Sequence, residues 1–247
     1  GIWSSVAPVL SRNDHASVLL SSGDLFTAGG SISGYTTSCQ IYWTATNIWS
    51  TRTAFPDSGR YSHTLTRLTN NNVLIAGGYN GVTAVSSCAV YNPTTNLWTS
   101  VGTFTSRYYH NTSLLPNGNV LAIGGYNGST AMSNCDIYNY QTFTWTTTST
   151  VFNRYFATAT ILHTGNLFVT GGTGSGSVTS SSTQLFDLTM NPSTGTWTNT
   201  GSFETGRYSH TTTLLPNNRV LIMGGYNSSY LSNCQLYDLT NGIWSST

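Results

Sequence analysis

Residues 60–98 read RYSHTLTRLTNNNVLIAGGYNGVTAVSSCAVYNPTTNLW, and this stretch contains the pattern that decides the fold. Residues 63–68 alternate between polar and apolar types, and after an asparagine-rich turn residues 73–76 form a short apolar run that ends in Gly-Gly. Alternation indicates a half-buried strand, and the apolar run indicates a strand buried on both faces. Residues 88–91 and the segment that begins at Leu97 predict two more strands, separated by an Asn-Pro turn.

The same pattern recurs five times along the 247 residues. The first glycines of the Gly-Gly pairs are 48, 47, 47 and 53 residues apart, at Gly29, Gly77, Gly124, Gly171 and Gly224. An arginine stands 17 residues before each pair, at Arg12, Arg60, Arg107, Arg154 and Arg207. A tryptophan closes each unit, at Trp49, Trp98, Trp145, Trp197 and Trp244. Four strands per unit, with no helical period between them, predict an all-β protein, a five-bladed β-propeller of four-stranded antiparallel blades.

The two ends of the chain carry the same segment, because residues 1–5 repeat residues 242–246 without a change. Both copies encode a fourth strand. We expect one propeller domain over residues 1–247, with blades at about 6–52, 53–101, 102–149, 150–201 and 202–247. The ring should be closed, with one copy paired in the last blade and the other, residues 1–5, outside it or loosely ordered.

Composition excludes several classes of function. Only 6% of the residues are charged, lysine is absent, and the formal net charge is +1. A protein that neutralises many phosphates carries a basic patch, so no nucleic-acid partner is expected. No apolar stretch is long enough to span a bilayer, and the chain does not start like a signal peptide, so no membrane insertion is expected.

The four cysteines occupy one repeat position, three residues before an aromatic residue of the third strand. They are Cys39, Cys88, Cys135 and Cys234. Equivalent positions on different blades should lie beyond the roughly 7 Å limit for a disulfide, so we expect free, buried thiols. We expect an extracellular or cell-surface location, although free thiols weaken that expectation because secreted chains more often use their cysteines in disulfides.

The order Gly-Gly, then Tyr91 thirteen residues after Gly78, then Trp98 seven beyond, resembles the kelch motif, which also builds the propeller of galactose oxidase. The resemblance covers nearly the whole chain. The fourth unit departs from it, with Phe186 in place of tyrosine and a longer gap to Trp197. Six or seven blades are usual in the family that the chain resembles, so five is a further departure.

The five repeat arginines allow two interpretations. Each could bond main-chain carbonyls of the adjacent blade, or the five could form a cationic ring that faces a ligand. The repeat histidines, His15, His63, His110 and His210, favour hydrogen bonds between blades over a metal site, because ring-equivalent imidazoles diverge around an axis. Ala157 takes their place in the fourth unit. No catalytic residue, metal ligand or cofactor is predicted.

Tyrosines beside the arginines and in the loops after Gly-Gly favour a binding face. Exposed Tyr and Asn next to Arg provide flat aromatic surfaces and fixed donors. In the kelch adaptors that this sequence resembles, a tyrosine after Gly-Gly and an arginine before the first strand are among the residues that hold a peptide. The predicted ligand-binding residues are Arg12, Arg60, Tyr61, Tyr79, Asn80, Arg107, Tyr108, Tyr126, Asn127, Arg154, Tyr155, Arg207, Tyr208, Tyr226 and Asn227.

The sequence therefore predicts a non-enzymatic binding scaffold for a carbohydrate or an extended peptide. One alternative is a copper-radical enzyme that resembles galactose oxidase, although the cysteines fall in the third strands and accessory domains are missing. Another is a purely structural unit of a longer repeat array, which fits the duplicated end segment. Few side chains are available for acid–base catalysis, since Glu204 is the sole glutamate.

Overall fold

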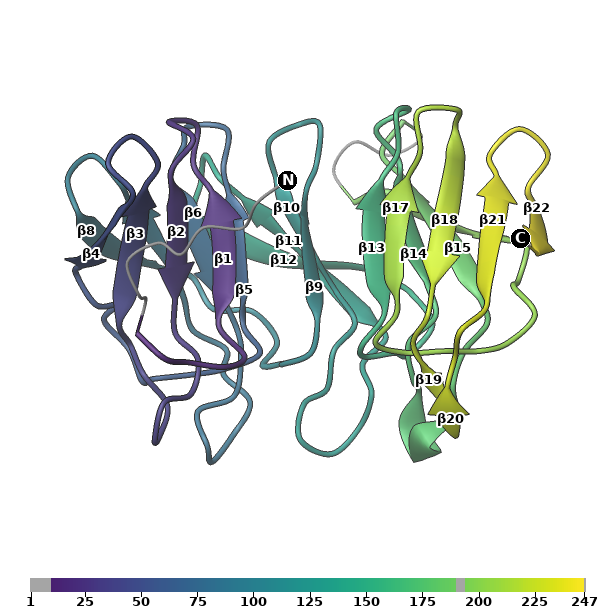
Figure 1. Ribbon diagram of the computed structural model, residues 1–247, viewed down its shortest axis with the longest axis horizontal. Coiled ribbons are helices and arrows are strands. Elements are labelled where there is room, and N and C mark those ends of the chain that lie inside the picture. The colour runs from purple at the N-terminus through teal and green to yellow at the C-terminus, as the bar shows by residue number, and fades with distance from the viewer. Residues whose placement is uncertain (1–9, 190–193, 247) are drawn as a thin grey trace. The chain divides into compact units, whose positions relative to one another are not determined.

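The computed structural model describes residues 10–189 and 194–246, and almost all regular structure in that part is β-strand. Five four-stranded antiparallel sheets follow one another along the chain (Figure 1). We call them blades 1 to 5. These sheets agree with a five-bladed β-propeller, so the predicted fold class is confirmed.

The strands of the blades have these bounds. Blade 1 contains β1 (Ala16–Leu19), β2 (Leu25–Ala28), β3 (Cys39–Trp43) and β4 (Ile48–Arg52). Blade 2 contains β5 (Thr64–Arg67), β6 (Val73–Ala76), β7 (Cys88–Asn92) and β8 (Leu97–Val101). Blade 3 contains β9 (Asn111–Leu114), β10 (Val120–Ile123), β11 (Asn134–Asn139) and β12 (Thr144–Thr150). Blade 4 contains β13 (Thr158–Ile161), β14 (Leu167–Thr170), β15 (Thr183–Asp187) and β16 (Thr196–Thr200). Blade 5 contains β17 (Thr211–Leu214), β18 (Arg219–Met223), β21 (Cys234–Asp238) and β22 (Ile243–Ser246).

Two short elements lie in the loops after the Gly-Gly pairs. A single 3₁₀ turn, Ser175–Ser177, follows the pair of blade 4, and the two-stranded hairpin β19 (Tyr226–Asn227) and β20 (Ser229–Tyr230) follows that of blade 5. No helix in residues 10–189 and 194–246 is long and apolar enough to cross a membrane.

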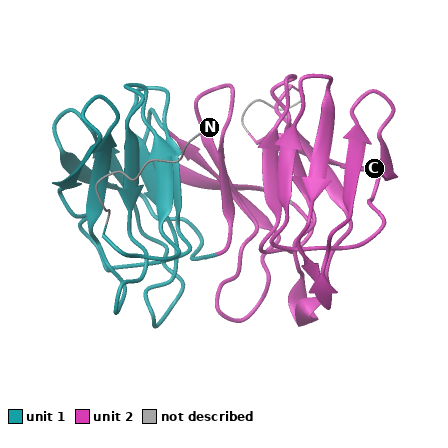
Figure 2. Cartoon of the chain, viewed as in Figure 1, with its two compact units in different colours: residues 1–108, 140–144 teal, residues 109–139, 145–247 magenta. Residues whose placement is uncertain are grey.

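The contacts divide the chain into two compact units (Figure 2). The first comprises residues 1–108 and 140–144, and therefore includes blades 1 and 2. The second comprises residues 109–139 and 145–247, and includes most of blade 3 with blades 4 and 5. The description below treats each unit separately.

The recurring tyrosine and tryptophan form a cross-strand pair in the outer half of a blade. In blade 2, Tyr91 lies opposite both Val73 and Trp98, and its ring centroid is 5.0 Å from that of Trp98. In blade 4, Phe186 takes the tyrosine's place opposite Trp197, at 4.9 Å. Directly opposed aromatic pairs stabilise an antiparallel sheet, which explains why the two residues keep a nearly constant spacing.

Neighbouring blades within a unit bury their faces against each other. In the first unit, Phe26 of β2 stacks on Tyr91 of β7 with centroids 4.6 Å apart. In the second unit, Phe168 of β14 packs against Tyr237 of β21 at 4.8 Å, while Leu167 and Val169 belong to the core shared with blade 3. The second strands of blades 2, 3 and 4, β6, β10 and β14, are buried throughout, as their apolar runs predict, whereas β18 of blade 5 keeps Arg219 and Met223 exposed.

The glycine pairs and the cysteines have the structural roles that the sequence suggests. Gly78 has a φ of 106°, and a Cβ there would lie 2.9 Å from the Tyr61 carbonyl oxygen, so the backbone approach requires glycine. All four cysteines are free thiols, of which Cys234 is only partly buried. The C-terminal copy of the repeated segment forms β22 and pairs with β21, as expected for one copy. Residues 1–5, the other copy, lie outside the described residues.

Candidate binding surface

The repeat arginines are clamps inside their own blades. The Nη1 atom of Arg60 donates to the carbonyl oxygens of Gly77 (3.1 Å) and Ser87 (3.0 Å). Arg154 and Arg207 donate in the same way to the carbonyl oxygens of Gly171 and Gly224, at 3.1 and 2.9 Å. Because these side chains reach the first glycine of their own blades, the arginines stand 17 residues before those glycines.

This geometry corrects the interpretation of the arginines as ligand-binding residues. Arg60, Arg107, Arg154 and Arg207 are at most 1% exposed. Arg12 is half-buried, and its Nη1 makes the equivalent bond to Gly29 at 2.9 Å. A guanidinium whose donors are occupied by carbonyls inside a blade cannot also face a ligand, so the five do not form an exposed cationic ring. The other interpretation, in which the arginines bond carbonyls of the adjacent blade, is also wrong. The carbonyls that accept from Arg12, Arg60, Arg154 and Arg207 belong to the arginine's own blade.

Four of the five arginines also lie against a phenylalanine of the segment before the first strand. The guanidinium carbons are 5.2 to 5.6 Å from the ring centroids, in the pairs Arg60–Phe55, Arg107–Phe104, Arg154–Phe152 and Arg207–Phe203. Burial lowers the pKa of Arg154 to about 10. The group therefore remains a cation at neutral pH, held by carbonyl dipoles and an aromatic face.

Two of the repeat histidines, His63 and His210, hold neighbouring blades together. His63 of blade 2 lies with Nε2 3.1 Å from the Ala28 carbonyl oxygen of blade 1, and His210 lies 3.0 and 3.1 Å from the hydroxyls of Thr158 and Thr170. Burial lowers the pKa of His63 to about 3 and that of His210 to about 4. The sequence favours hydrogen bonds between blades for these histidines, and His63 and His210 make such bonds. Among the described residues, no three His, Cys, Asp or Glu side chains group closely enough to hold a metal ion.

The predicted tyrosines of the first unit do come together. The residue after Arg60 pairs with the residue after Gly-Gly, so Tyr61 and Tyr79 exchange two main-chain hydrogen bonds of 3.1 and 2.9 Å. Their rings stand edge to face at 5.7 Å. Tyr35 stacks on Tyr61 at 5.2 Å, and Tyr108 lies 5.0 Å from Tyr79. We call these four residues the first aromatic cluster.

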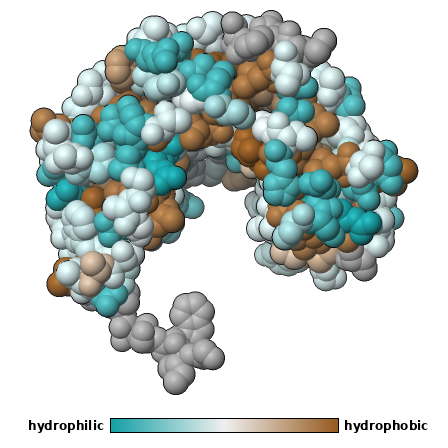
Figure 3. All heavy atoms as spheres, turned by 90° about the horizontal axis from the view of Figure 1, so that it is seen from above, coloured by the Kyte–Doolittle hydropathy of each residue, from teal (hydrophilic) through white to brown (hydrophobic). Residues whose placement is uncertain are grey.

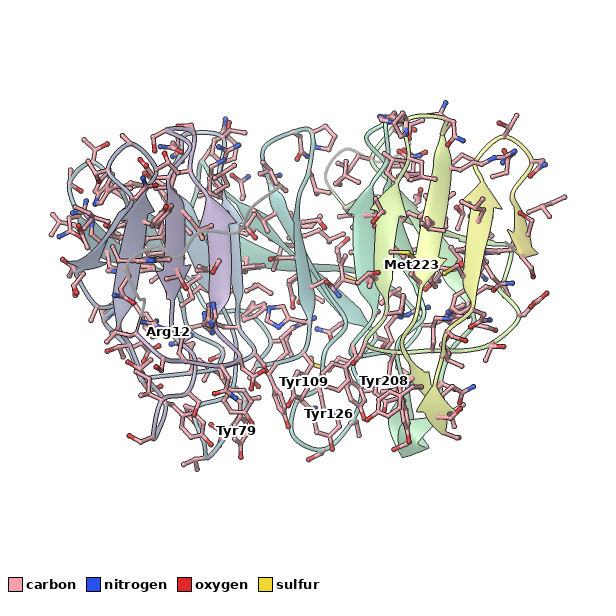
Figure 4. All side chains as sticks on the ribbon, in the orientation of Figure 1. Arg12, Tyr79, Tyr109, Tyr126, Tyr208 and Met223 are labelled. Atoms are coloured by element: carbon pink, nitrogen blue, oxygen red, sulfur yellow. The ribbon has the colours of Figure 1, made fainter. Side chains whose placement is uncertain are left out.

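The second unit holds a larger group of rings at the same ends of its blades. Tyr155 lies 5.1 Å from Tyr126 and 5.1 Å from Phe156, and Phe156 lies 5.8 Å from Tyr208. The second aromatic cluster comprises Tyr109, Tyr126, Tyr155, Phe156, Tyr208, Tyr226 and Tyr230. Figure 4 shows Tyr109, Tyr126 and Tyr208 on the loops at that end, and Tyr79 on the corresponding loops of blade 2.

Most rings of both clusters are half-exposed. Tyr35 and Tyr230 are more exposed, at 44% and 91%. Burial, and then the neighbouring Tyr126 and Tyr208, raise the pKa of Tyr155, so its phenol stays neutral and can donate a hydrogen bond. The clusters therefore offer flat apolar faces with hydroxyl edges, and no charged side chain belongs to them.

The predicted asparagines mainly shape the loops. The Oδ1 atom of Asn80 accepts hydrogen bonds from the amides of Val82 and Thr83, at 3.0 and 2.9 Å, and Asn127 does the same for Ser129 and Thr130. The side-chain nitrogens of Asn80 and Asn127 remain at the surface as donors. Asn227 differs, because its Oδ1 accepts from the Thr179 hydroxyl at 3.0 Å.

The sequence prediction of the site missed four cluster residues, namely Tyr35, Tyr109, Phe156 and Tyr230. Phe156 stands two residues after its arginine, as do Asp14, Ser62, Tyr109 and Ser209, and all five have left-handed φ angles between 50° and 55°. The amide of Phe156 donates to the Tyr109 carbonyl of the previous blade at 3.2 Å, and that of Ser62 donates to Asp14 at 3.2 Å. Large aromatic residues at a strained position filled elsewhere by Asp or Ser are a signal that comparison of the repeats could have found.

Away from these loops the surface is mixed. On the face that Figure 3 shows, hydrophilic and hydrophobic residues are interspersed and do not gather into one large patch. Of the few charged residues, Arg219 and Asp238 form a surface ion pair of 3.4 Å in blade 5.

Comparison with known protein families agrees with the repeat architecture. The Kelch motif profile matches residues 60–105, 107–150 and 207–247, which together make up more than half of the chain. The matches begin at Arg60, Arg107 and Arg207. They omit the first and fourth repeats, whose loops after Gly-Gly also lack the Tyr-Asn pair. A search of curated proteins gave no match. The chain belongs to the kelch family, and its blades are kelch repeats.

Proposed function

We propose that this kelch protein is a non-catalytic binding scaffold that holds an extended peptide on the tyrosine-bearing loops. Kelch propellers serve as protein-interaction modules. In this chain the aromatic clusters provide exposed rings that a protein partner can contact. Tyrosine provides a large contact area with few rotatable bonds, so its ordering on binding costs little entropy.

The packing of the tyrosines is the observation that supports this proposal. Tyr35, Tyr61, Tyr79 and Tyr108 form a continuous series of ring contacts between 5.0 and 5.7 Å in the first unit. Main-chain bonds hold Tyr61 and Tyr79 at their bases. A half-exposed ring that is fixed before the ligand arrives is the type of residue that dominates binding energies.

A carbohydrate ligand is the second candidate, because the exposed groups of the clusters are neutral. Phenol hydroxyls and the side-chain nitrogens of Asn80 and Asn127 are suited to sugar hydroxyls, and the tyrosine faces to the apolar face of a sugar ring. The arginine clamps leave no cation within the clusters, so an acidic peptide is not favoured over an uncharged one.

Selection from a displayed library of random dodecapeptides, with a glycan array in parallel, tests the proposal. The test variants exchange a ring for the residue that another repeat carries at the same position: Tyr79→Ser, as in Ser31, and Tyr226→Thr, as in Thr173. We expect at least tenfold weaker binding of selected peptides by one or both variants, equivalent to about 1.4 kcal/mol or more.

The control is Leu97→Ser, which removes an apolar side chain that is 61% exposed on the outer strand β8. It should leave binding unchanged. Glycans bound in place of peptides would move the assignment to carbohydrate recognition, and a blank result in both assays would contradict the proposal.

A further inference from the structure

Blade 4 contains a cavity of about 330 Å³ in the loop segments where its sequence departs from the other repeats. Its lining comes from residues 152–153 and from the loop after Gly-Gly, residues 174–182, all within the second unit. Small-molecule sites start at roughly 300 Å³, so the cavity has room for one sugar-sized ligand.

The cation of Arg154 lies beside this cavity and has no carboxylate partner among the described residues. All five of its donors are satisfied by neutral acceptors: the carbonyls of Phe152, Gly171 and Ser182, the Ser182 hydroxyl at 2.9 Å, and the Gln184 side-chain oxygen at 3.0 Å. Burial accordingly lowers the pKa of Arg154 to about 10, and the opposing contribution comes from Cys135 and not from a carboxylate. A buried, unneutralised charge polarises the hydrogen-bonded groups around it.

Two serine hydroxyls carry that polarisation to the cavity. The Ser182 hydroxyl, which accepts from Arg154, lies 2.7 Å from the Ser180 hydroxyl, and both residues line the cavity. Ser180 Oγ also accepts from the Ser182 amide at 3.1 Å. Whichever serine donates to the other, one hydroxyl proton of the pair has no acceptor in the described part of the chain. The pair therefore presents a polarised donor to whatever occupies the cavity.

Blade 2 shows which chemical group binds to an arginine–serine pair of this kind. Its equivalent residues are Arg60 and Ser87, and there the chain supplies its own carboxylate: Asp57 accepts from Arg60 Nη2 at 2.5 Å and from the Ser87 hydroxyl. Blade 4 has the buried Val151 three residues before its arginine, where blade 2 has Asp57. The cavity of blade 4 thus borders the equivalent serine hydroxyl, which accepts from the equivalent arginine, without an internal anion.

We infer that the cavity of blade 4 binds the carboxylate of a hexuronic acid residue at Ser180 and Ser182. The remaining lining suits a sugar ring better than a thin acidic side chain. Phe152, 46% exposed, and Val178 provide an apolar wall for one ring face, and Asn153 and Ser175 place an amide and a hydroxyl at the rim for ring hydroxyls. This inference does not depend on the ligand of the aromatic clusters.

The test compares two probes that differ only at the carboxylate, methyl α-D-galacturonoside and methyl α-D-galactoside. Affinities are measured from the amide chemical shifts of the ¹⁵N-labelled full chain. A charge-assisted hydrogen bond strengthens binding by tenfold or more, so the uronoside should bind at least about tenfold more tightly than the galactoside.

Ser180→Ala should reduce that preference to about twofold or less. Repeat 2 has Val85 at the same position, so loss of the hydroxyl is compatible with the fold. Ser181→Ala is the matched control, because Ser181 is the adjacent residue, does not line the cavity and should leave the preference intact.

Three results would overturn the inference: equal binding of the two sugars, a preference that survives Ser180→Ala, or binding of N-acetylglutamate as tight as that of the uronoside. The last result would assign the site to an acidic polypeptide side chain. None of these results bears on the tyrosine clusters, whose ligand is tested with Tyr79→Ser and Tyr226→Thr.

Discussion

An arginine and the tyrosine after it serve different purposes because adjacent residues of an extended segment face opposite sides. Arg60 points into blade 2 and bonds the Gly77 carbonyl, whereas Tyr61 points outward and packs against Tyr79. The arginine thus fixes the Gly-Gly turn from which the next tyrosine emerges. We therefore expect a ligand on this surface to contact the tyrosines and the arginines to act only by positioning them.

The buried histidines make stability depend on pH. His210 is neutral in the folded protein with a pKa of about 4, whereas an exposed histidine in the unfolded chain has a pKa of about 6.5. Because the folded-state pKa is the lower one, the unfolded chain binds the proton first. The stabilisation is complete above pH 6.5 and is lost as the pH falls from 6.5 towards 4.

We predict that His210→Ala, which installs the residue that repeat 4 carries as Ala157, reduces this pH dependence. Between pH 7 and pH 5 the free energy of unfolding of the unmodified protein should fall by about 2 kcal/mol more than that of the variant. Urea denaturation at the two pH values measures the difference. His163→Ala, at an exposed position, is the control and should behave like the unmodified protein. An identical fall in His210→Ala would show that His210 is not buried in its neutral form.

The site could be predicted from the sequence only in part, and the reason is geometric. The 17-residue spacing identified the arginines, but it did not tell whether they face the loop surface or the blade interior. The extended segment that carries Arg60 and Tyr61 excludes an outward position for both, and only the pairing of Tyr61 with Tyr79 settles which one faces out. Tyr35 joins the first cluster through a contact between loops, which no local pattern encodes, and Tyr230 joins the second through the β19–β20 hairpin, which the repeat pattern does not contain.

At the scale of the element, the outer strands of blades 2 and 5 are attached to the preceding blade by their tryptophans. Trp98 of β8 donates from Nε1 to the Thr53 carbonyl at 2.9 Å, and Trp244 of β22 donates to the Gly201 carbonyl at 2.8 Å. Thr53 and Gly201 each directly follow the outer strand of the blade before. Trp197 of β16 differs, because its buried Nε1 has no acceptor among the described residues.

We predict opposite outcomes for the same substitution in two blades. Trp244→Phe keeps an aromatic ring beside Tyr237 but removes the hydrogen bond to Gly201, so the free energy of unfolding should fall by about 1 kcal/mol. Trp197→Phe removes a buried N–H group that has no partner, so stability should stay the same or rise by up to about 1 kcal/mol. Guanidinium denaturation of the two variants provides the comparison. Equal losses would mean that ring packing alone determines the role of these tryptophans.

The strands themselves follow closely from the sequence. The apolar run of residues 73–76 is β6 without a change of bounds, and the segment from Cys88 extends one residue beyond the predicted end to give β7. These strands are encoded locally, because apolar residues and a following glycine pair or Asn-Pro turn define them. The loops after Gly-Gly vary between repeats, and the 3₁₀ turn of blade 4 has no counterpart in the pattern.

At the scale of the whole molecule, the repeated end segment raises the question of which copy completes the last blade. The C-terminal copy does so as β22, whose Trp244 lies 5.3 Å from Phe203 and 6.1 Å from Phe168. Residues 1–5 carry the same five amino acids. In a closed ring, which remains a prediction from the sequence, the two copies would compete for one edge position.

Truncation of each end, alone and together, tests that prediction. Removal of residues 242–247 exposes the apolar surface that Trp244 covers, which should lower the free energy of unfolding by roughly 3 kcal/mol or more if nothing replaces the strand. In a closed ring residues 1–5 can take the vacated position, so this deletion alone should have a smaller effect. Removal of residues 1–5 alone should have almost none, and the double deletion should be less stable than the two single effects predict. Independent sites give additive changes in the free energy of unfolding, so an additive result would mean that the first copy does not reach the last blade.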